Sequence, residues 1–126
     1  MVDKPRRARF QRTMRLLTAS DYESVFQQPQ RSSGKALTVL ARASGCASPR
    51  LGLAIPRKQI RRAVDRNRAK RLIRESFRQH QELLRGLDVV VMGKSALLEK
   101  DTRAVFACLE NHWHRVSERC KSSAAC

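Results

Sequence analysis

The amino-acid sequence predicts an α/β (α+β) fold: a two-layer sandwich in which helices pack on a small mixed sheet, with elements in the order α-β-β-α-β-α. The chain has 126 residues. This length suits one domain, and such a chain can bury roughly two-thirds of its unfolded surface without a disulfide or a metal. Short apolar segments with the pattern of strands lie between longer segments with the spacing of amphipathic helices.

The first helix is predicted to begin at Ser20 and to end before Pro29. Ser20 and Glu23 have the spacing of a capping box, in which the hydroxyl and the carboxylate bind exposed amides of the first turn. One face of this helix carries Tyr22, Val25 and Phe26. The two rings either stack on unpaired bases or pack in the core, and core packing is the favoured interpretation for Phe26.

Two strands are predicted next. Residues 35–43 alternate apolar and other side chains, and residues 51–55 do the same until Pro56. The intervening residues 44–49 include glycine and proline, which is typical of a loop. We therefore expect these two strands to pair as an antiparallel hairpin.

The second half is predicted to be helix, strand and helix. A long helix covers about 61–84, with Gly86 as its stop signal, and residues 87–92 form an apolar strand buried on both faces. A last helix covers about 101–117, with Asp101 as a possible N-cap. Its buried face consists of Val105, Leu109, Trp113 and Val116. The strand–helix–strand unit is expected to be right-handed on general grounds.

The predicted domain spans residues 16–117. Residues 1–15 are basic and indicate a flexible N-terminal arm, and the small, polar residues 118–126 indicate a disordered tail. No secretory signal is apparent, so a cytoplasmic location is expected. The four cysteines, Cys46, Cys108, Cys120 and Cys126, have no C-x-x-C spacing and are expected to be free thiols.

Charge is the strongest functional indication. The chain has 27 Lys and Arg against 11 Asp and Glu, a net charge of +16, and a pI near 11.3. Such an imbalance opposes compaction and favours a polyanionic partner, usually nucleic acid. Arginine predominates and suits bidentate phosphate contacts, which favours structured RNA. A membrane partner is disfavoured, because the single tryptophan, Trp113, lies outside the most basic segment.

Half of the net charge lies between residues 57 and 78. This segment has ten cations against Asp65 and Glu75, a net of +8. The cations are Arg57, Lys58, Arg61, Arg62, Arg66, Arg68, Lys70, Arg71, Arg74 and Arg78. A solvated helix usually mixes both signs, so this segment is the predicted RNA-binding surface.

Helical periodicity divides this segment into two faces. The face towards the sheet is predicted to contain Ala69, Leu72, Ile73, Ser76 and Phe77, and the outward face Asn67, Lys70, Arg71, Arg74 and Arg78. Arg68 lies at the margin of the basic face. Arg66 falls on the apolar side, where it either orders the fold or contacts RNA. The Asn67 amide either reads a base edge or a ribose hydroxyl, or makes a local backbone hydrogen bond.

A self-sufficient catalyst is not indicated. The sequence has no P-loop, no H-E-x-x-H motif and no acidic pair at the spacing of a two-metal nuclease. Zinc binding by His112 and His114 is disfavoured, because their spacing is typical of residues along a helix.

The run from Ala63 to Glu75, with Arg66-Asn67-Arg68 at its centre, resembles the signature of the bacterial ribonuclease P protein subunit. The strand and basic turn at 50–58 and the strand at 88–91 are similar to those of the same family. The first helix of the family is resembled by three pairs of residues, Leu16-Leu17, Asp21-Tyr22 and Val25-Phe26. The resemblance covers residues 14–117.

This resemblance implies a compact α/β sandwich with a left-handed βαβ crossover. It implies two partners, the catalytic RNA subunit of ribonuclease P and the 5′ leader of precursor tRNA. It also implies that Mg²⁺ bound by the RNA hydrolyses the phosphodiester, so that the protein alone binds no cofactor and has no catalytic residue. A ribosomal-type or RNA-chaperone protein that binds structured RNA is the alternative, and a stand-alone nuclease is a third hypothesis.

The resemblance also implies roles by position. Residues facing the catalytic RNA or the leader would be Arg66, Asn67, Arg68, Lys70, Arg71 and Arg74. Arg57 and Lys58 would extend the leader cleft, which Tyr22 and Phe26 would line. Tyr22 stands where the family often has phenylalanine, and Leu40 where some members have an aromatic residue.

Overall fold

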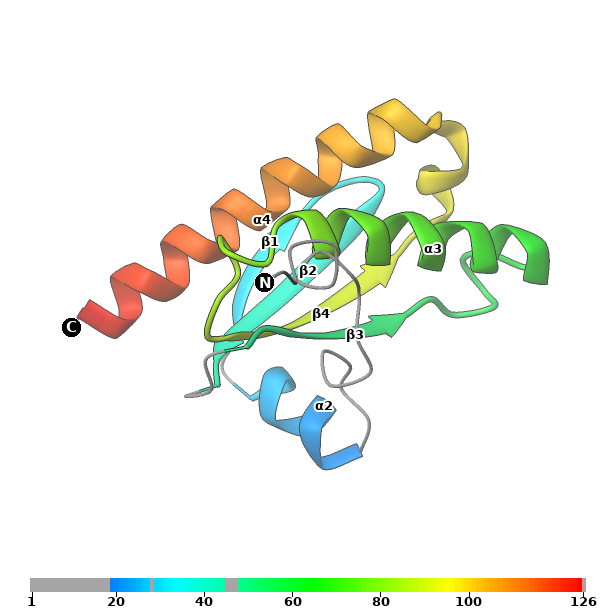
Figure 1. Cartoon of the computed structure of the whole chain (residues 1–126). Coiled ribbons are helices and arrows are strands. Elements are labelled where there is room, and N and C mark those ends of the chain that lie inside the picture. Colours follow the sequence, from blue (N-terminus) through cyan, green and yellow to red (C-terminus); the bar gives the residue numbers. More distant parts are fainter. Residues whose placement is uncertain (1–18, 28, 45–47, 126) are drawn as a thin grey trace, which may run out of the picture.

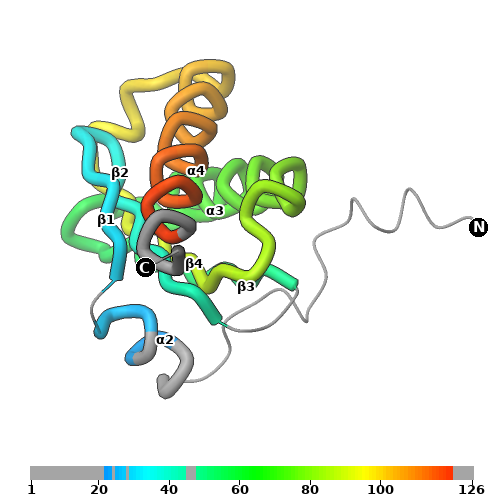
Figure 2. The backbone as a smooth tube through the Cα atoms, turned by 90° about the vertical axis from the view of Figure 1, so that its left-hand side faces the viewer, coloured from blue at the N-terminus to red at the C-terminus, as the bar shows by residue number. Residues whose placement is uncertain are grey.

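The computed structural model describes residues 19–27, 29–44 and 48–125, which form one four-stranded sheet with helices on both of its faces (Figure 1). Helices α3 and α4 cover one face, and the short helix α2 lies against the other (Figures 1 and 2). The elements are α2 (Ala19–Phe26), β1 (Gln30–Ser33), β2 (Leu37–Ala43), β3 (Arg50–Ala54), α3 (Ala63–Gln79), β4 (Leu87–Gly93), the 3-10 helix η2 (Ser95–Glu99) and α4 (Thr102–Ala125). The predicted α+β class with a small mixed sheet is confirmed.

The sheet has the strand order β1-β2-β4-β3. Strand β4 is antiparallel to β2 and parallel to β3. It is central, and its first five residues are buried, as expected for a continuous apolar run. The prediction of a strand buried on both faces is therefore confirmed.

The predicted hairpin between 35–43 and 51–55 is wrong. Strand β2 pairs with β1 on one side and β4 on the other, so the hairpin is β1–β2. Strand β1 was not predicted, because Gln30–Ser33 contains no apolar residue and hence no alternation. Its one buried side chain, Ser32, has its Oγ 2.7 Å from His112 Nδ1. A partner 80 positions away therefore holds this strand.

The β3–α3–β4 crossover is left-handed. The two strands are parallel neighbours, and α3 lies on the same side of the sheet as α4 (Figure 1). Seen from the helical side with both strands pointing upward, β4 lies to the left of β3 (Figures 1 and 2). The expectation from the family resemblance is confirmed, and the general expectation of a right-handed crossover is wrong here.

The main core lies between the sheet and helices α3 and α4. Trp113 is fully buried and meets Phe77 edge-on, with ring centroids 6.0 Å apart, and its Nε1 donates to Ser76 Oγ at 2.9 Å. The predicted buried face of α4 is confirmed, since Val105, Leu109, Trp113 and Val116 are all fully buried. A smaller cluster of Val25, Leu40 and Val90 lies under α2.

Two helix ends differ from the prediction. Helix α3 ends at Gln79, because His80 Nδ1 donates to the Ser76 carbonyl at 2.7 Å, while the His80 amide turns to the Phe77 carbonyl. Gly86, with a φ of 79°, lies in the following turns just before β4 and does not end the helix. Helix α4 continues to Ala125, so the predicted disordered tail is helical up to that residue.

Other predictions concern the ends of elements. Asp101 Oδ1 accepts the Ala104 amide at 2.8 Å, which confirms the N-cap of α4. The 3-10 helix η2 was not predicted. The predicted N-terminal arm is not among the residues that the structure describes, and the Ser20 side chain of the capping box is not among the described side chains.

Candidate nucleic-acid interface

Helix α3 presents a polar and basic stripe to solvent. Its sheet-facing residues Ala69, Ile73, Ser76 and Phe77 are buried, as the periodicity predicts. On the other side Asn67 and Arg71 are exposed, and Lys70 and Arg74 are half-buried. We call Asn67, Lys70, Arg71 and Arg74 the outward stripe. The division of the helix into two faces is confirmed.

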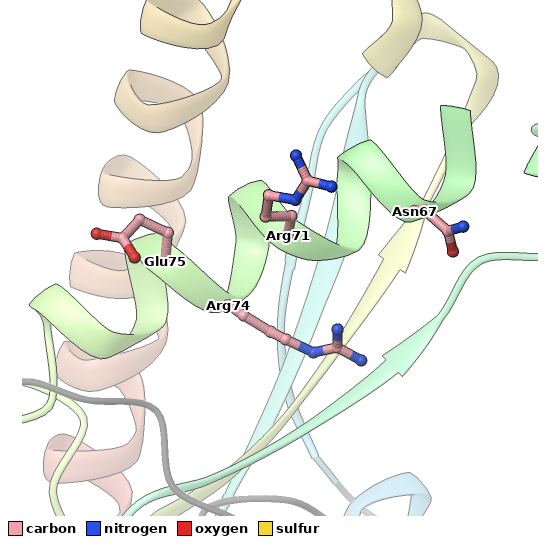
Figure 3. A pocket seen from close by; sticks show the side chains of 4 residues that line it. All are labelled: Asn67, Arg71, Arg74 and Glu75. Carbon is pink, nitrogen blue, oxygen red and sulfur yellow. The ribbon is translucent and has the colours of Figure 1, made fainter. Parts of the chain in front are cut away.

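A hollow of about 390 Å³ lies along this stripe, lined by Asn67, Arg71, Arg74 and Glu75. Figure 3 shows the Arg74 side chain extending along α3 towards the end that carries Asn67, with Glu75 at the opposite end. Two guanidinium groups and an amide therefore border one concave surface. Guanidinium donors match phosphate oxygens in pairs, and the amide both donates and accepts.

The carboxylate of Glu75 is bound by its own helix. Arg78 Nε donates to Glu75 Oε1 at 3.0 Å, Arg78 Nη2 contacts Oε2, and Gln79 Nε2 donates at 3.1 Å. The hydrogen bond from Arg78 holds the pKa of Glu75 below its ordinary value, while partial burial opposes this shift. The same hydrogen bond raises the pKa of Arg78. Arg78, predicted on the outward face, is thus an ion-pair partner of Glu75.

Arg66 has a structural contact. Its Nη1 donates to the carbonyls of Ile60 at 3.0 Å and Arg61 at 2.7 Å, and the N-cap residue Arg62 makes no side-chain capping bond. Arg66 therefore stabilises the turn that enters α3. Exposed cations precede it in this segment: Arg57, Lys58, Arg61 and Arg62. Of the two alternatives left open for Arg66, the role in ordering the fold has a physical basis in these two bonds.

Arg68 and Asn67 differ in their surroundings. Arg68 Nη2 donates to Thr102 Oγ1 at 3.2 Å, which joins the beginnings of α3 and α4. Asn67 is exposed, and no residue that the structure describes forms a hydrogen bond with its side-chain amide. The local backbone hydrogen bond considered for Asn67 is therefore not formed with those residues.

A second surface lies on the α2 side of the sheet. Tyr22 is half-buried, and its hydroxyl accepts the Leu53 amide of the edge strand β3 at 3.3 Å. Ala54 and Met92, like Tyr22, pack against the cluster under α2. Phe26 is 47% exposed. We call Tyr22, Phe26, Ala54 and Met92 the α2 face.

One expectation about this surface is corrected. Core packing, favoured for Phe26, is wrong, because the residue keeps 47% of its surface exposed. Leu40, which stands where some family members have an aromatic residue, is 1% exposed and lies under α2, beneath this surface. Met92 and Ala54 were not predicted to lie on this surface. Alternation along β4 places Met92 on the same side as Val90, and this signal was available.

Among the described residues, no helix has the length and apolar character needed to cross a membrane. No three His, Cys, Asp or Glu side chains in the described ranges gather as a metal site would require. Cys108 and Cys120 are free thiols, as predicted, and burial raises the pKa of Cys120.

The chain is similar in sequence to ribonuclease P proteins. The family model described as Ribonuclease P matches residues 10–117. The ribonuclease P protein component of Nitrosococcus oceani is 46% identical over 114 residues, covering 90% of this chain and 96% of that protein. The component of Methylococcus capsulatus is 47% identical over 116 residues, covering 92% and 91%.

Solved structures of RNase P proteins have a fold similar to that of this chain. The RNase P protein from Thermotoga maritima is 31% identical, with a TM-score of 0.72, and the match covers 81% of this chain and 96% of that one. An RNase P protein mutant from Staphylococcus aureus, described as defective in mRNA degradation activity, has a TM-score of 0.73 at 24% identity, covering 79% and 85%. At that identity the likeness concerns the fold alone.

Proposed function

The chain belongs to the ribonuclease P protein family, and we propose that it is the protein subunit of a cytoplasmic ribonuclease P holoenzyme. In this proposal it binds the catalytic RNA and the 5′ leader of precursor tRNA. The holoenzyme hydrolyses one phosphodiester, which removes the leader and leaves the mature 5′ end. The single observation that carries the proposal is the outward stripe of α3, within the segment that resembles the family signature.

The outward stripe suits the phosphates of a folded RNA. Lysine and arginine side chains that neutralise phosphates release counterions, which drives binding and makes it depend on salt. An α-helix does not enter the deep, narrow groove of regular double-stranded RNA easily. We therefore expect α3 to bind an irregular region of the catalytic RNA, and we expect Asn67 to contact a base edge or a ribose hydroxyl there.

The α2 face suits a single strand. Unpaired bases stack on exposed aromatic rings with little dependence on sequence. The bond from the Leu53 amide holds the Tyr22 hydroxyl, so the orientation of the ring is set before any leader binds. Phe26 follows Tyr22 by one helical turn and has exposed ring surface. We propose that these two residues stack on leader bases, and that Arg57 and Lys58 contact leader phosphates.

The proposed contribution of the protein to the reaction is positioning and charge. In this proposal the catalytic RNA would hold the Mg²⁺ that activates the attacking water, and the protein would supply no catalytic residue or cofactor. Cations beside the leader reduce the repulsion between the leader and the catalytic RNA. Reduced repulsion lowers the Mg²⁺ concentration needed for productive binding and broadens the range of precursors that are cleaved.

The test uses purified protein, catalytic RNA and precursor tRNA at low Mg²⁺. We expect no leader removal by the protein alone, slow removal by the RNA alone and faster removal by both together. Cleavage by the protein alone would contradict the proposal. If the protein binds the RNA but does not stimulate cleavage, the alternative of a ribosomal-type or RNA-chaperone protein is favoured.

A further inference from the structure

A second group of cations lies where strand β1 meets helix α4. It consists of Arg31 on β1, Lys35 in the β1–β2 turn, Lys94 after β4, and Arg115 and Arg119 on α4. Arg31, Lys35, Arg115 and Arg119 are exposed, and Lys94 is half-buried. We call these five residues the β1 ridge.

Tertiary contacts bring the β1 ridge together. The Lys94 Nζ donates to the Gly34 carbonyl at 2.7 Å, and Arg119 Nη1 donates to the carbonyl of Arg31. A Cβ atom at Gly34 would lie 3.2 Å from His112 Nε2, so the turn approaches α4 closely. Besides burial, the charges of Arg115 and Lys94 lower the pKa of His112, which places both cations near this histidine.

The charge of the β1 ridge is not neutralised within the described part of the chain. None of its five cations forms an ion pair there, whereas Arg50 is bound to Asp88 at 2.7 Å. Glu118 is the nearest acidic residue in sequence and is exposed. It lies about 60° further around α4 than Arg115, away from β1.

The β1 ridge is separate from the outward stripe. Arg115 and Arg119 lie within about 60° of His112 around α4, on the flank that faces β1. Ser117, whose Oγ donates to the Leu83 carbonyl at 3.0 Å, is about 140° from His112, on the flank that faces the end of α3. Figure 2 shows β1 and β3 at opposite edges of the sheet. Three strand spacings, about 14 Å, separate these edges.

Protection of an edge strand is the simpler explanation for part of the β1 ridge. Charged side chains on an edge strand oppose pairing with another chain. That explanation covers Arg31 and Lys35. It does not cover Arg115, which projects from α4, nor the absence of a described carboxylate partner for any of the five cations.

We propose that the β1 ridge is a second RNA-binding surface, which contacts the phosphates of an RNA segment different from the segment bound by α3. The two surfaces would let one protein join two parts of a folded RNA. The identity of the partner as the catalytic RNA rests on the proposed function. The separation of the two surfaces rests on the geometry of α4 and the sheet.

The test compares two matched double variants in the full-length protein. Lys35→Ala/Arg115→Ala removes two exposed cations of the β1 ridge whose side chains form no hydrogen bond or ion pair with a described residue. Arg85→Ala/Arg103→Ala removes two exposed cations outside both surfaces. Binding to the catalytic RNA is measured over a range of salt concentrations. We expect the first variant to flatten the plot of log K against log salt by one to two units, at about 0.9 unit per phosphate contact, and the control to leave it unchanged.

Hydroxyl-radical footprinting on the same complexes distinguishes the two surfaces. We expect Lys35→Ala/Arg115→Ala to lose protection at one RNA segment and Arg71→Ala to lose it at another. Equal salt slopes for the two double variants, or loss of the same phosphates in both footprints, would overturn the proposal. The charge-preserving variant Arg115→Lys is expected to keep the parent slope. If the unaltered protein does not bind the catalytic RNA, the proposed function itself fails.

Discussion

Helix α3 and strand β1 both carry exposed arginines, but different interactions position them. In α3 the apolar residues Ile73 and Phe77 are buried, and helical spacing then turns the cations outward. Strand β1 has no apolar residue and is held by the bond between Ser32 and His112, 80 positions apart. The placement of charge in α3 is therefore a local consequence of the sequence, whereas in β1 it depends on tertiary contacts.

The replacement with the largest expected effect on this comparison is His112→Ala. It leaves the buried Ser32 hydroxyl without its partner and a void beneath the edge strand. We expect the free energy of unfolding to fall by about 2 kcal/mol, measured by urea denaturation. His114→Ala is the matched control, because His114 is exposed on the same helix and lies 3.9 Å from Glu110. A change below about 0.5 kcal/mol is expected for the control. Equal losses in both variants would refute the role of His112.

Acid should also lower the stability of the folded state, because protonation of the buried His112 is unfavourable. Burial, followed by the charges of Arg115 and Lys94, holds the pKa of His112 below its ordinary value near 6.5. The folded state thus binds fewer protons than the unfolded state, and stability must rise with pH in this window. We expect the stabilisation to be complete above about pH 6.5 and to be lost as the pH falls through the lowered pKa. Denaturation at several pH values should show a smaller slope for His112→Ala than for the parent.

Arg66→Ala tests helix α3, in which the placement of the cations depends on neighbouring residues in the sequence. The substitution removes the two bonds to the carbonyls of Ile60 and Arg61. We expect a loss of about 1 kcal/mol in the free energy of unfolding, because the turn entering α3 loses its side-chain partner. Arg62→Ala, at an exposed position without a side-chain capping bond, is the control and should be nearly neutral. A parent-like melting temperature for Arg66→Ala would show that the bonds are not stabilising.

These contrasts explain which features the sequence analysis predicted. The two faces of α3, the buried face of α4 and the Asp101 cap depend on neighbours within a few positions, and all three are confirmed. Strand β1 and its pairing with β2 were missed, because β1 has no apolar residue and its buried Ser32 meets His112, 80 positions away. The end of α3 depends on a hydrogen bond by His80, and neither helix propensity nor periodicity indicates it.

The candidate site shows the same division. The position of Asn67, Lys70, Arg71 and Arg74 on the side of α3 opposite its buried residues follows from helical periodicity, whereas the partial burial of Lys70 and Arg74 was not predicted. The pairing of Arg78 with Glu75 was not predicted, although the two residues have the i,i+3 spacing that permits it. The exposure of Phe26 also escaped prediction, because the size and direction of the space under α2 are tertiary properties.

Arg71→Ala probes the outward stripe without a structural contact. Because Arg71 is exposed, we expect its melting temperature to stay near that of the parent. Binding to the catalytic RNA should weaken by on the order of 1 kcal/mol, and the salt slope should flatten by about one unit. Arg85→Ala, exposed in the turns after α3, is the control. An unchanged salt slope for Arg71→Ala would place this residue outside the RNA contact.

The smallest expected effect concerns Tyr22, where a side chain of the α2 face is fixed by a backbone amide. Tyr22→Phe keeps the ring and removes only the hydroxyl that accepts the Leu53 amide at 3.3 Å. We expect the holoenzyme to lose roughly 0.5 kcal/mol of its preference for precursor over mature tRNA, because the ring stays but is less well oriented. Tyr22→Ala removes the ring and should cost about 1 kcal/mol or more of the same preference. Only the precursor carries a leader to stack on the ring, so equal losses for precursor and mature tRNA would argue against leader stacking at Tyr22.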